Sequence, residues 1–160
     1  MENKVLVAYF TWSGTSKIVA EIMKEELNAD IFQIEVVKKY PDKYITCVAQ
    51  AGVEKLKKER PQLKEELENI SDYNKIVLVF PNWWGTLPMP VFSFLEKYDF
   101  TGKTILPICM HGGGGLTKTI KDLEKVCSTA NVLEGTPIKK QDTELEATKE
   151  ILKKLAEGIK

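Results

Sequence analysis

Short apolar runs alternate along this chain with longer segments whose apolar residues recur at helical spacing. Four runs are nearly unbroken, at residues 5–10, 31–37, 76–80 and 105–110, which is typical of strands covered on both faces in a parallel sheet. Apolar side chains three and four positions apart in residues 16–27 predict a helix directly after the first run. Because parallel strands need crossover connections, the alternation predicts an α/β fold.

Two further helices and a divided fifth strand complete the pattern. Apolar helix faces are formed by Leu116, Ile120, Leu123 and Cys127, and by Leu145, Thr148, Leu152, Leu155 and Ile159. Asp142 or Thr143 would cap the second of these helices. Residues 131–133 and 136–138 predict a fifth strand that is interrupted at Gly135-Thr136-Pro137. The whole pattern is that of a doubly wound sheet with helices on both faces.

The segment of residues 38–73 is longer than a simple crossover needs. Apolar residues recur at helical spacing in its middle, at Ile45, Val48, Val53 and Leu56. Pro61 should end this helix, because proline lacks the amide hydrogen that a helix interior uses. We expect one long helix here, followed by a short second one.

The composition is that of a globular protein. With 160 residues, 43% of them hydrophobic, the chain predicts one domain that spans residues 1–160. No apolar stretch is long enough to span a bilayer, and the amino terminus lacks a signal-peptide core, which favours the cytoplasm. Basic and acidic residues balance at 23 each, so we expect no nucleic-acid or membrane partner.

Cysteine and histidine are too few and too scattered to predict a metal site. Cys47, Cys109 and Cys127 form no C-x-x-C pair, and His111 is the single histidine. We therefore interpret the cysteines as free thiols, buried or incidental.

The loops that follow strands one, three and four are the most unusual stretches of the sequence. In an open parallel sheet, ligands bind outside the carboxyl ends of the strands, at the point where the strand order reverses. These three loops should meet at that edge. We therefore expect the function of the chain to lie in them.

The first of these loops is Thr11-Trp12-Ser13-Gly14-Thr15-Ser16, with four hydroxyls and a glycine between a strand and a helix. A dianionic phosphate suits this place, because backbone amides and the positive end of the helix dipole point at it and hydroxyls add strong donors. Gly14 allows close approach or a positive φ angle. No Walker loop, G-x-G-x-x-G fingerprint or phosphatase cysteine is present. The alternative for this loop alone is a Ser/Thr-rich helix cap.

The second loop reads Pro81-Asn82-Trp83-Trp84-Gly85 and leads through two more prolines into a short helix that begins near Val91. Two adjacent tryptophans at the exposed end of a strand suit stacking on a flat aromatic ligand. We slightly favour Trp84 over Trp83 as the ring contact. The alternative places the tryptophans in the core or in a subunit interface, which we expect of one of the two.

The third loop is His111-Gly112-Gly113-Gly114-Gly115, directly after strand four. Four consecutive glycines suit a backbone that lies against a flat ligand and donates amides to its edge. The alternative is a flexible surface turn.

In their order and placement the three loops resemble the flavodoxin family, and more narrowly its short-chain members with a W-x-G loop. The family's phosphate turn usually reads hydroxyl-x-Thr-Gly-x-Thr, which residues 11–16 match with serine replacing threonine twice. Residues 81–86 resemble the loop beside the isoalloxazine ring, and residues 112–115 resemble the third loop, often Gly-Gly-Ser-Gly. The resemblance implies a five-stranded sheet of order 2-1-3-4-5 that binds FMN at its switch point, a rule for which flavodoxin is itself the standard example.

The resemblance also implies a redox protein in which FMN does the chemistry and the chain orients and tunes it. A backbone carbonyl between Asn82 and Gly85 would accept a hydrogen bond from the reduced ring. His111 would neutralise charge on that ring or pass a proton to a substrate; otherwise it is a loop histidine exposed to water. Electrons would pass to a redox partner protein or to a small acceptor.

Two other functions stay open. One is an NAD(P)H-dependent reductase of quinones or similar acceptors, which needs no acidic docking face, and the zero net charge departs from the acidic habit of electron-shuttle flavodoxins. The other is a flavodoxin-shaped interaction module without flavin. A phosphoreceiver is not expected, because Phe10-Thr11 and Pro81-Asn82 stand where its acidic residues would lie.

Overall fold

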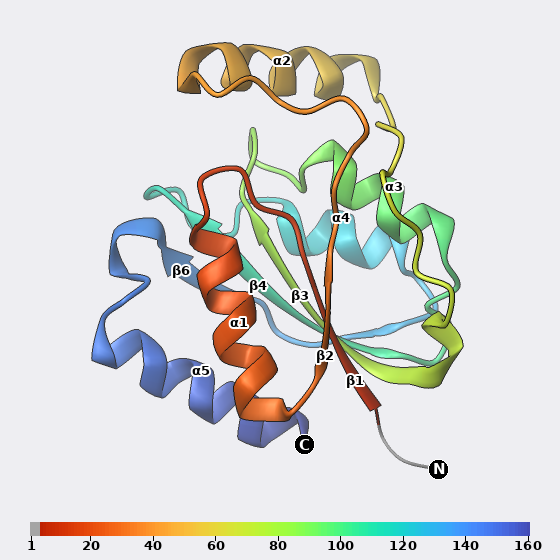
Figure 1. Cartoon of the computed structure of the whole chain (residues 1–160), viewed down its shortest axis with the longest axis vertical. Helices are drawn as coiled ribbons and strands as arrows, with labels where there is room; N and C mark the ends of the chain where they lie inside the picture. Colours follow the sequence, from red (N-terminus) through yellow and green to blue (C-terminus); the bar gives the residue numbers. More distant parts are fainter. Residues whose placement is uncertain (1–3) are drawn as a thin grey trace.

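A parallel sheet forms the centre of the computed structural model (Figure 1), which describes residues 4–160 and leaves the first three residues outside the described part. Its strands in the order 2-1-3-4-5 are β2 (Asp30–Gln33), β1 (Lys4–Tyr9), β3 (Tyr73–Pro81), β4 (Thr104–His111) and β5 (Asn131–Val132). A sixth strand, β6 (Thr136–Lys139), pairs with β4 beyond β5. The predicted strand order and the divided fifth strand are therefore confirmed.

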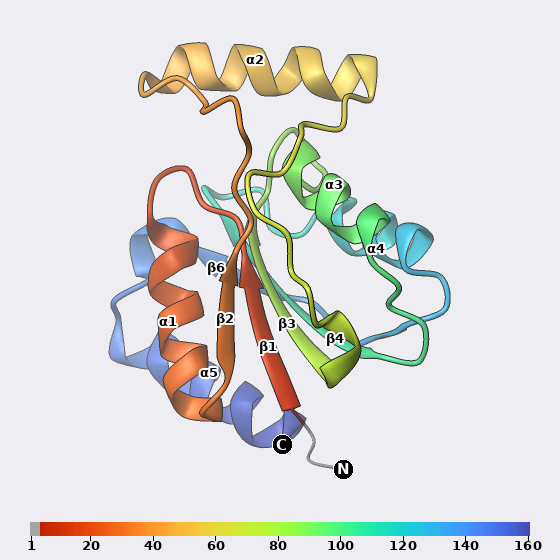
Figure 2. The same cartoon turned by 45° about the vertical axis from the view of Figure 1, so that its right-hand side comes forward.

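Helices cover both faces of the sheet, as predicted. Figure 1 and Figure 2 show α1 (Thr15–Leu27) and α5 (Glu146–Ile159) on one face, and α3 (Met89–Lys97) and α4 (Thr119–Val126) on the other. Alternate residues of each central strand face the two layers: in β1, Val7 packs with the α1 side and Leu6 with the α3 side. Both faces are buried, which explains the unbroken apolar runs.

The second strand is shorter than the predicted 31–37. The amide of Ile34 donates to the Tyr9 carbonyl (2.7 Å), and beyond that bond the chain leaves β1. Val36 then pairs with Leu63 in an isolated antiparallel bridge. The apolar residues at the end of the predicted run therefore belong to this antiparallel bridge and not to β2.

The predicted cap of the carboxyl-terminal helix is wrong. Helix α5 follows Leu145, and no side chain caps its first turn. Asp142 instead belongs to a short 3₁₀ helix, η2 (Lys140–Asp142), and the Thr143 hydroxyl donates to the Lys140 carbonyl (2.7 Å). Both predicted capping residues therefore complete the turn that precedes α5.

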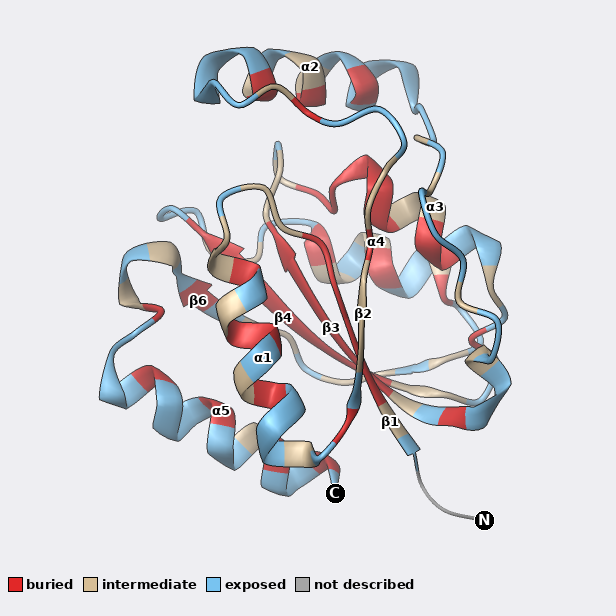
Figure 3. Ribbon diagram, in the orientation of Figure 1, coloured by how far each residue is buried: buried red, intermediate tan, exposed pale blue. Residues whose placement is uncertain are grey.

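The helix between β2 and β3 departs from the doubly wound pattern. Helix α2 (Tyr44–Lys57) is the long helix that the sequence predicts, but it lies across the carboxyl ends of the strands and not against a face of the sheet (Figure 1 and Figure 2). It ends before Pro61, and the short second helix is only the 3₁₀ turn η1 (Ile70–Asp72). Figure 3 shows most of α2 exposed. Within residues 4–160, no helix has the length and apolarity that crossing a membrane requires.

Candidate functional site

The turn between β1 and α1 holds hydroxyls that do not cap the helix. Gly14 is the residue before α1, with φ of 98°, and no side chain caps the first turn of that helix. The Thr11 hydroxyl accepts a bond from the Gly14 amide (2.9 Å), which shapes the turn. The Ser16 hydroxyl is buried and has no hydrogen-bond partner in the structure. Buried hydroxyls are almost always bonded, so this one suits a ligand oxygen.

The loop after β3 forms a tight turn at its two tryptophans. Trp83 and Thr86 exchange backbone hydrogen bonds of 3.1 and 3.2 Å. The two residues between them, Trp84 and Gly85, have positive φ angles of 55° and 79°. Positive φ at both central positions is the geometry of a type I′ turn, which glycine adopts without strain. The turn therefore fixes the directions of the two indoles independently.

The two tryptophans have different surroundings. The Trp83 ring lies edge-on to Phe10 and to Tyr40, with ring centroids 5.1 Å apart in each pair. The Trp84 side chain is 54% exposed, and its indole nitrogen donates to the Val48 carbonyl of α2 (2.9 Å). Trp83 thus belongs to the rim of the core, whereas Trp84 contacts α2. The assignment of Trp84 as the ring contact stays a prediction.

Asn82 joins the second loop to the third. Its side-chain nitrogen donates to the Gly115 carbonyl and to the Thr117 hydroxyl, both at 2.8 Å, and its side-chain oxygen accepts the Gly85 amide (3.0 Å). The side-chain amide uses three hydrogen-bonding positions within the protein. Sequence reasoning placed Asn82 at the ligand, and it missed Thr117.

The carbonyls expected to face a reduced ring are engaged within the protein. The Trp83 carbonyl accepts the Thr86 amide, and the Gly85 carbonyl accepts the Lys118 amide (3.0 Å). The Trp84 carbonyl accepts the side-chain amine of Lys55 (2.6 Å). A new donor at any of these three carbonyls therefore shares it with, or displaces, an existing partner.

His111 is a buried residue that shapes the glycine loop. It is 7% exposed, so the interpretation as a histidine exposed to water is wrong. Its Nδ1 atom accepts the amides of Gly113 (3.0 Å) and Gly115 (3.1 Å). The imidazole therefore holds the glycine loop from within, through one ring nitrogen.

The four glycines of this loop differ in what the fold requires of them. Gly113 and Gly115 have φ angles of 149° and 74°, which favour glycine. Gly112 and Gly114 do not have φ angles in this region. A Cβ atom at either position would meet no atom of the described residues within 4 Å, apart from the adjacent residues. Within residues 4–160, neither backbone conformation nor a close contact requires glycine at these two positions, and the space beside them is open.

A cavity of about 250 Å³ lies between the loops and α2. One side of this cavity is formed by Trp12 of the first turn and by Asn82, Trp83 and Trp84 of the second loop. Helix α2 closes it with Tyr44, Cys47, Val48 and Ala51, and Lys140 contributes the cation. None of Gly112–Gly115 lines this cavity. The structure therefore unites the first two predicted loops, and the third joins them through Asn82.

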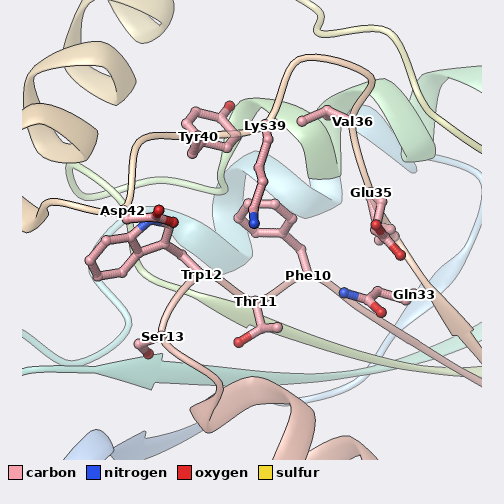
Figure 4. Close-up of a pocket in the computed structure, with 11 residues that line it drawn as sticks. Phe10, Thr11, Trp12, Ser13, Gln33, Glu35, Val36, Lys39, Tyr40 and Asp42 are labelled. Atoms are coloured by element: carbon pink, nitrogen blue, oxygen red, sulfur yellow. The ribbon is translucent and has the colours of Figure 1, made fainter.

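A second cavity, of about 510 Å³, lies on the other side of the first turn (Figure 4). It is lined by residues of the first turn and of β2 and the segment after it: Phe10, Thr11, Trp12, Ser13, Gln33, Ile34, Glu35, Val36, Lys39, Tyr40 and Asp42. The Trp12 indole donates to the Pro41 carbonyl (2.9 Å), which ties the turn to that segment. Trp12 lines both cavities and stands between them.

Sequence reasoning missed Lys140 and the α2 residues of the smaller cavity. Lys140 follows β6 at the same edge of the sheet as the three loops, and that position was the signal available. The three cysteines are free and buried, as interpreted from the sequence. Burial raises the pKa of the Cys109 thiol to about 12, and the Thr119 side chain and the Lys140 ammonium act in the opposite direction.

A doubly wound parallel sheet with the three candidate loops at the β1–β3 switch point defines a flavodoxin-like fold. The family model described as flavodoxin matches residues 4–155. The chain belongs to the flavodoxin family. No curated protein sequence matches it at a significant level.

Several solved structures share the fold over nearly the whole chain. A candidate flavoprotein of Bacteroides eggerthii is 25% identical, with a TM-score of 0.84 and coverage of 99% of this chain and 98% of the other. One of Bacteroides uniformis is 27% identical, with a TM-score of 0.85 and coverage of 98% and 99%. A Lactobacillus acidophilus flavoprotein in complex with FMN is 18% identical, with a TM-score of 0.74 and coverage of 91% and 98%.

Proposed function

We propose that this chain is an FMN-binding redox protein of the flavodoxin type that holds the FMN phosphate in the turn of residues 11–16. The observation that carries the proposal is the buried Ser16 hydroxyl, which has no hydrogen-bond partner in the structure and lies in the first turn of α1, a turn that no side chain caps. Such a helix terminus offers backbone amides and positive potential to a phosphate. The FMN complex of the Lactobacillus flavoprotein supports the same choice of cofactor.

The flavin ring would occupy the cavity beneath α2. Bound FMN supplies reversible electron transfer, and the chain supplies its surroundings. The indoles of Trp12, Trp83 and Trp84 would exclude water from the ring faces, because all three line this cavity. The amides of Gly112 and Gly114, which His111 does not hold, would donate to the ring edge from beside the cavity. The Lys140 ammonium, which lines the cavity, would stabilise negative charge that arrives with electrons.

The protein then passes electrons to an acceptor, either a redox partner protein or a small molecule. His111 contributes by holding the glycine loop, through the two amides that its Nδ1 atom accepts. Asn82 contributes by fixing the second and third loops to one another. Both residues therefore orient the site within the protein.

Titration of the flavin-free protein with FMN and with riboflavin tests this function. Both ligands have the same ring, but only FMN has the phosphate. We expect FMN fluorescence to be quenched on binding, and FMN to bind at least about tenfold more tightly than riboflavin, because charge-assisted hydrogen bonds hold the phosphate. Equal affinities would contradict the phosphate site. A colourless protein that binds neither ligand would favour the interaction module.

A further inference from the structure

Helix α2 contributes little to the core of the protein. Its buried residues are Cys47, Ala51 and Glu54, and two of its apolar side chains, Ile45 and Leu56, are 81% and 85% exposed. Figure 1 shows the helix set across the top of the sheet, apart from the two helix layers that cover its faces. A helix with so small a buried face is held by few apolar contacts, so individual polar contacts decide its position.

Tyr40 supplies one of those contacts, because its hydroxyl donates to the buried Glu54 carboxylate, and Trp84 supplies two more. The Trp84 indole nitrogen donates to the Val48 carbonyl, and the Lys55 amine donates to the backbone carbonyl of Trp84. The indole also lies directly against Gly52: a Cβ atom at that position would be 3.0 Å from the ring atoms Cε2 and Cζ2 of Trp84. Glycine at residue 52 thus allows the helix and the tryptophan to approach this closely.

This contact closes the cavity in which we place the flavin ring. The cavity measures about 250 Å³, somewhat less than the roughly 300–1,000 Å³ of most ligand pockets. Four of its lining residues, Tyr44, Cys47, Val48 and Ala51, come from α2. A three-ring ligand in this cavity would therefore lie directly beneath the helix.

We propose that α2 is a movable roof over the flavin ring, latched by Trp84 against Gly52, and that it admits only small, flat organic acceptors to the ring. The inference rests on the proposed function. A redox partner protein cannot place its own redox centre against a ring that α2 covers. The aromatic walls suit a flat conjugated molecule, and Lys140 suits one whose oxygens gain negative charge on reduction.

Conjugated dicarbonyl compounds, the quinones, have this chemistry. Such an acceptor gains two electrons and two protons, and its two carbonyls become hydroxyls. In the overall reaction an external reduced nicotinamide, whose flat ring must pass beneath α2 before the acceptor does, gives up a hydride and is oxidised, and solvent supplies the second proton. The proposal therefore favours a small-molecule reductase over an electron shuttle between proteins.

The experiment compares a small acceptor with a large one. The FMN-loaded protein is reduced with one equivalent of dithionite and mixed rapidly with benzoquinone or with ferricytochrome c, and free reduced FMN provides the reference ratio of rates. The quantity compared is the rate of oxidation by benzoquinone divided by the rate of oxidation by ferricytochrome c. We expect this ratio to be at least about tenfold larger for the protein than for free FMN, because a closed site excludes the larger molecule. A ratio equal to that of free FMN would overturn the proposal.

Two variants of the roof and one matched control sharpen the comparison. Gly52→Leu places a side chain against the Trp84 indole and should lower the ratio of the quinone rate to the cytochrome rate to that of free FMN. Lys55→Met should lower this ratio by a smaller amount. Gly158→Leu is the control, because Gly158 also lies in a helix, α5, but a Cβ atom there meets nothing within 4 Å. An equal response of Gly158→Leu would contradict the latch.

Two readouts do not depend on turnover. Gly52→Leu should speed the dissociation of FMN about tenfold, because a roof that cannot close no longer retains the ligand. Hydrogen exchange of the α2 amides should slow when FMN binds to the unaltered protein. Unchanged exchange in α2 would overturn the roof while leaving the proposed function standing. Failure to bind FMN at all would instead overturn the proposed function.

Discussion

Helices α1 and α2 have nearly equal lengths, 13 and 14 residues, and both border the candidate site, yet the fold uses them in different ways. Helix α1 buries Ser16, Val19, Ala20 and Met23 against the sheet. Helix α2 buries a smaller face and leaves Ile45 and Leu56 in solvent. Both sequences are amphipathic. The contrast teaches that an apolar stripe marks a helix, but that neighbouring elements decide whether the stripe is buried.

The difference has a consequence for the site. A helix packed along the sheet holds its first turn in a fixed place, which suits an anchor for a phosphate. A helix that touches the rest of the protein mainly through Trp84, Tyr40 and the residues near them can move without unfolding the core. The site thus combines a rigid anchor at α1 with a mobile cover at α2.

Truncation of one apolar side chain in each helix is the strongest test of this contrast. Met23→Ala should lower the free energy of unfolding by about 2–4 kcal/mol, because it leaves a cavity in the core between α1 and the sheet. Leu56→Ala should change it by less than about 0.5 kcal/mol, because that side chain is already in solvent. Denaturant unfolding of the flavin-free protein measures both. A similar loss in the two variants would show that α2 is packed as firmly as α1.

The sequence predicts the anchor better than the cover, for a physical reason. The strands are apolar runs and the loops follow them directly, so the strands, helix α1 and the turn of residues 11–16 can be predicted from local pattern. The strand order is predicted only through the resemblance to the flavodoxin family. The position of α2 depends on how it meets Trp84 and Gly52, which are distant in the chain. An apolar residue such as Leu56 has the same pattern whether it is buried or exposed, and here it is exposed.

Two site residues illustrate the same limit. Lys140 lines the cavity because β6 ends beside β4; its place after the predicted fifth strand indicated the edge of the sheet but not the cavity. The burial of His111 depends on the glycine loop that folds over its Nδ1 atom. Glycine content predicted an unusual loop, but not that a side chain organises it from within.

Removal of one hydroxyl separates anchoring from stability. Ser16→Ala should weaken FMN binding about tenfold and leave riboflavin binding unchanged, because a hydrogen bond to a charged group contributes about 1.5–3 kcal/mol. The flavin-free protein should keep or slightly gain stability, since the variant deletes a buried hydroxyl that has no partner. Parallel flavin titrations and unfolding curves check both results. An equal loss for the two flavins would move the role of Ser16 away from the phosphate.

Substitution of Lys140 tests the electrostatics of the cavity beneath α2. Lys140→Gln removes the cation that lines the cavity, so the two-electron reduction potential of bound FMN should fall by roughly 20–40 mV, which corresponds to about 1–2 kcal/mol. Equilibration with a reference dye measures the potential. Lys139→Gln is the control, because the neighbouring lysine is exposed and does not line the cavity. A fall of the same size in both variants would assign the effect to net charge and not to the cavity.

The glycine loop gives the smallest expected effect and a test between two kinds of glycine. Gly112→Ala should leave the stability of the flavin-free protein within about 0.5 kcal/mol, because its Cβ atom would meet nothing in the chain. It should nevertheless weaken FMN binding several-fold, because the added methyl group occupies the space that a ligand edge would approach. Gly115→Ala should instead destabilise the protein by about 1 kcal/mol or more, since φ there is 74°. Unfolding curves and FMN titrations of the two variants separate these effects. If Gly112→Ala bound FMN normally, the open side of the loop would not face the ligand, and the loop would act only through its contacts with Asn82 and His111.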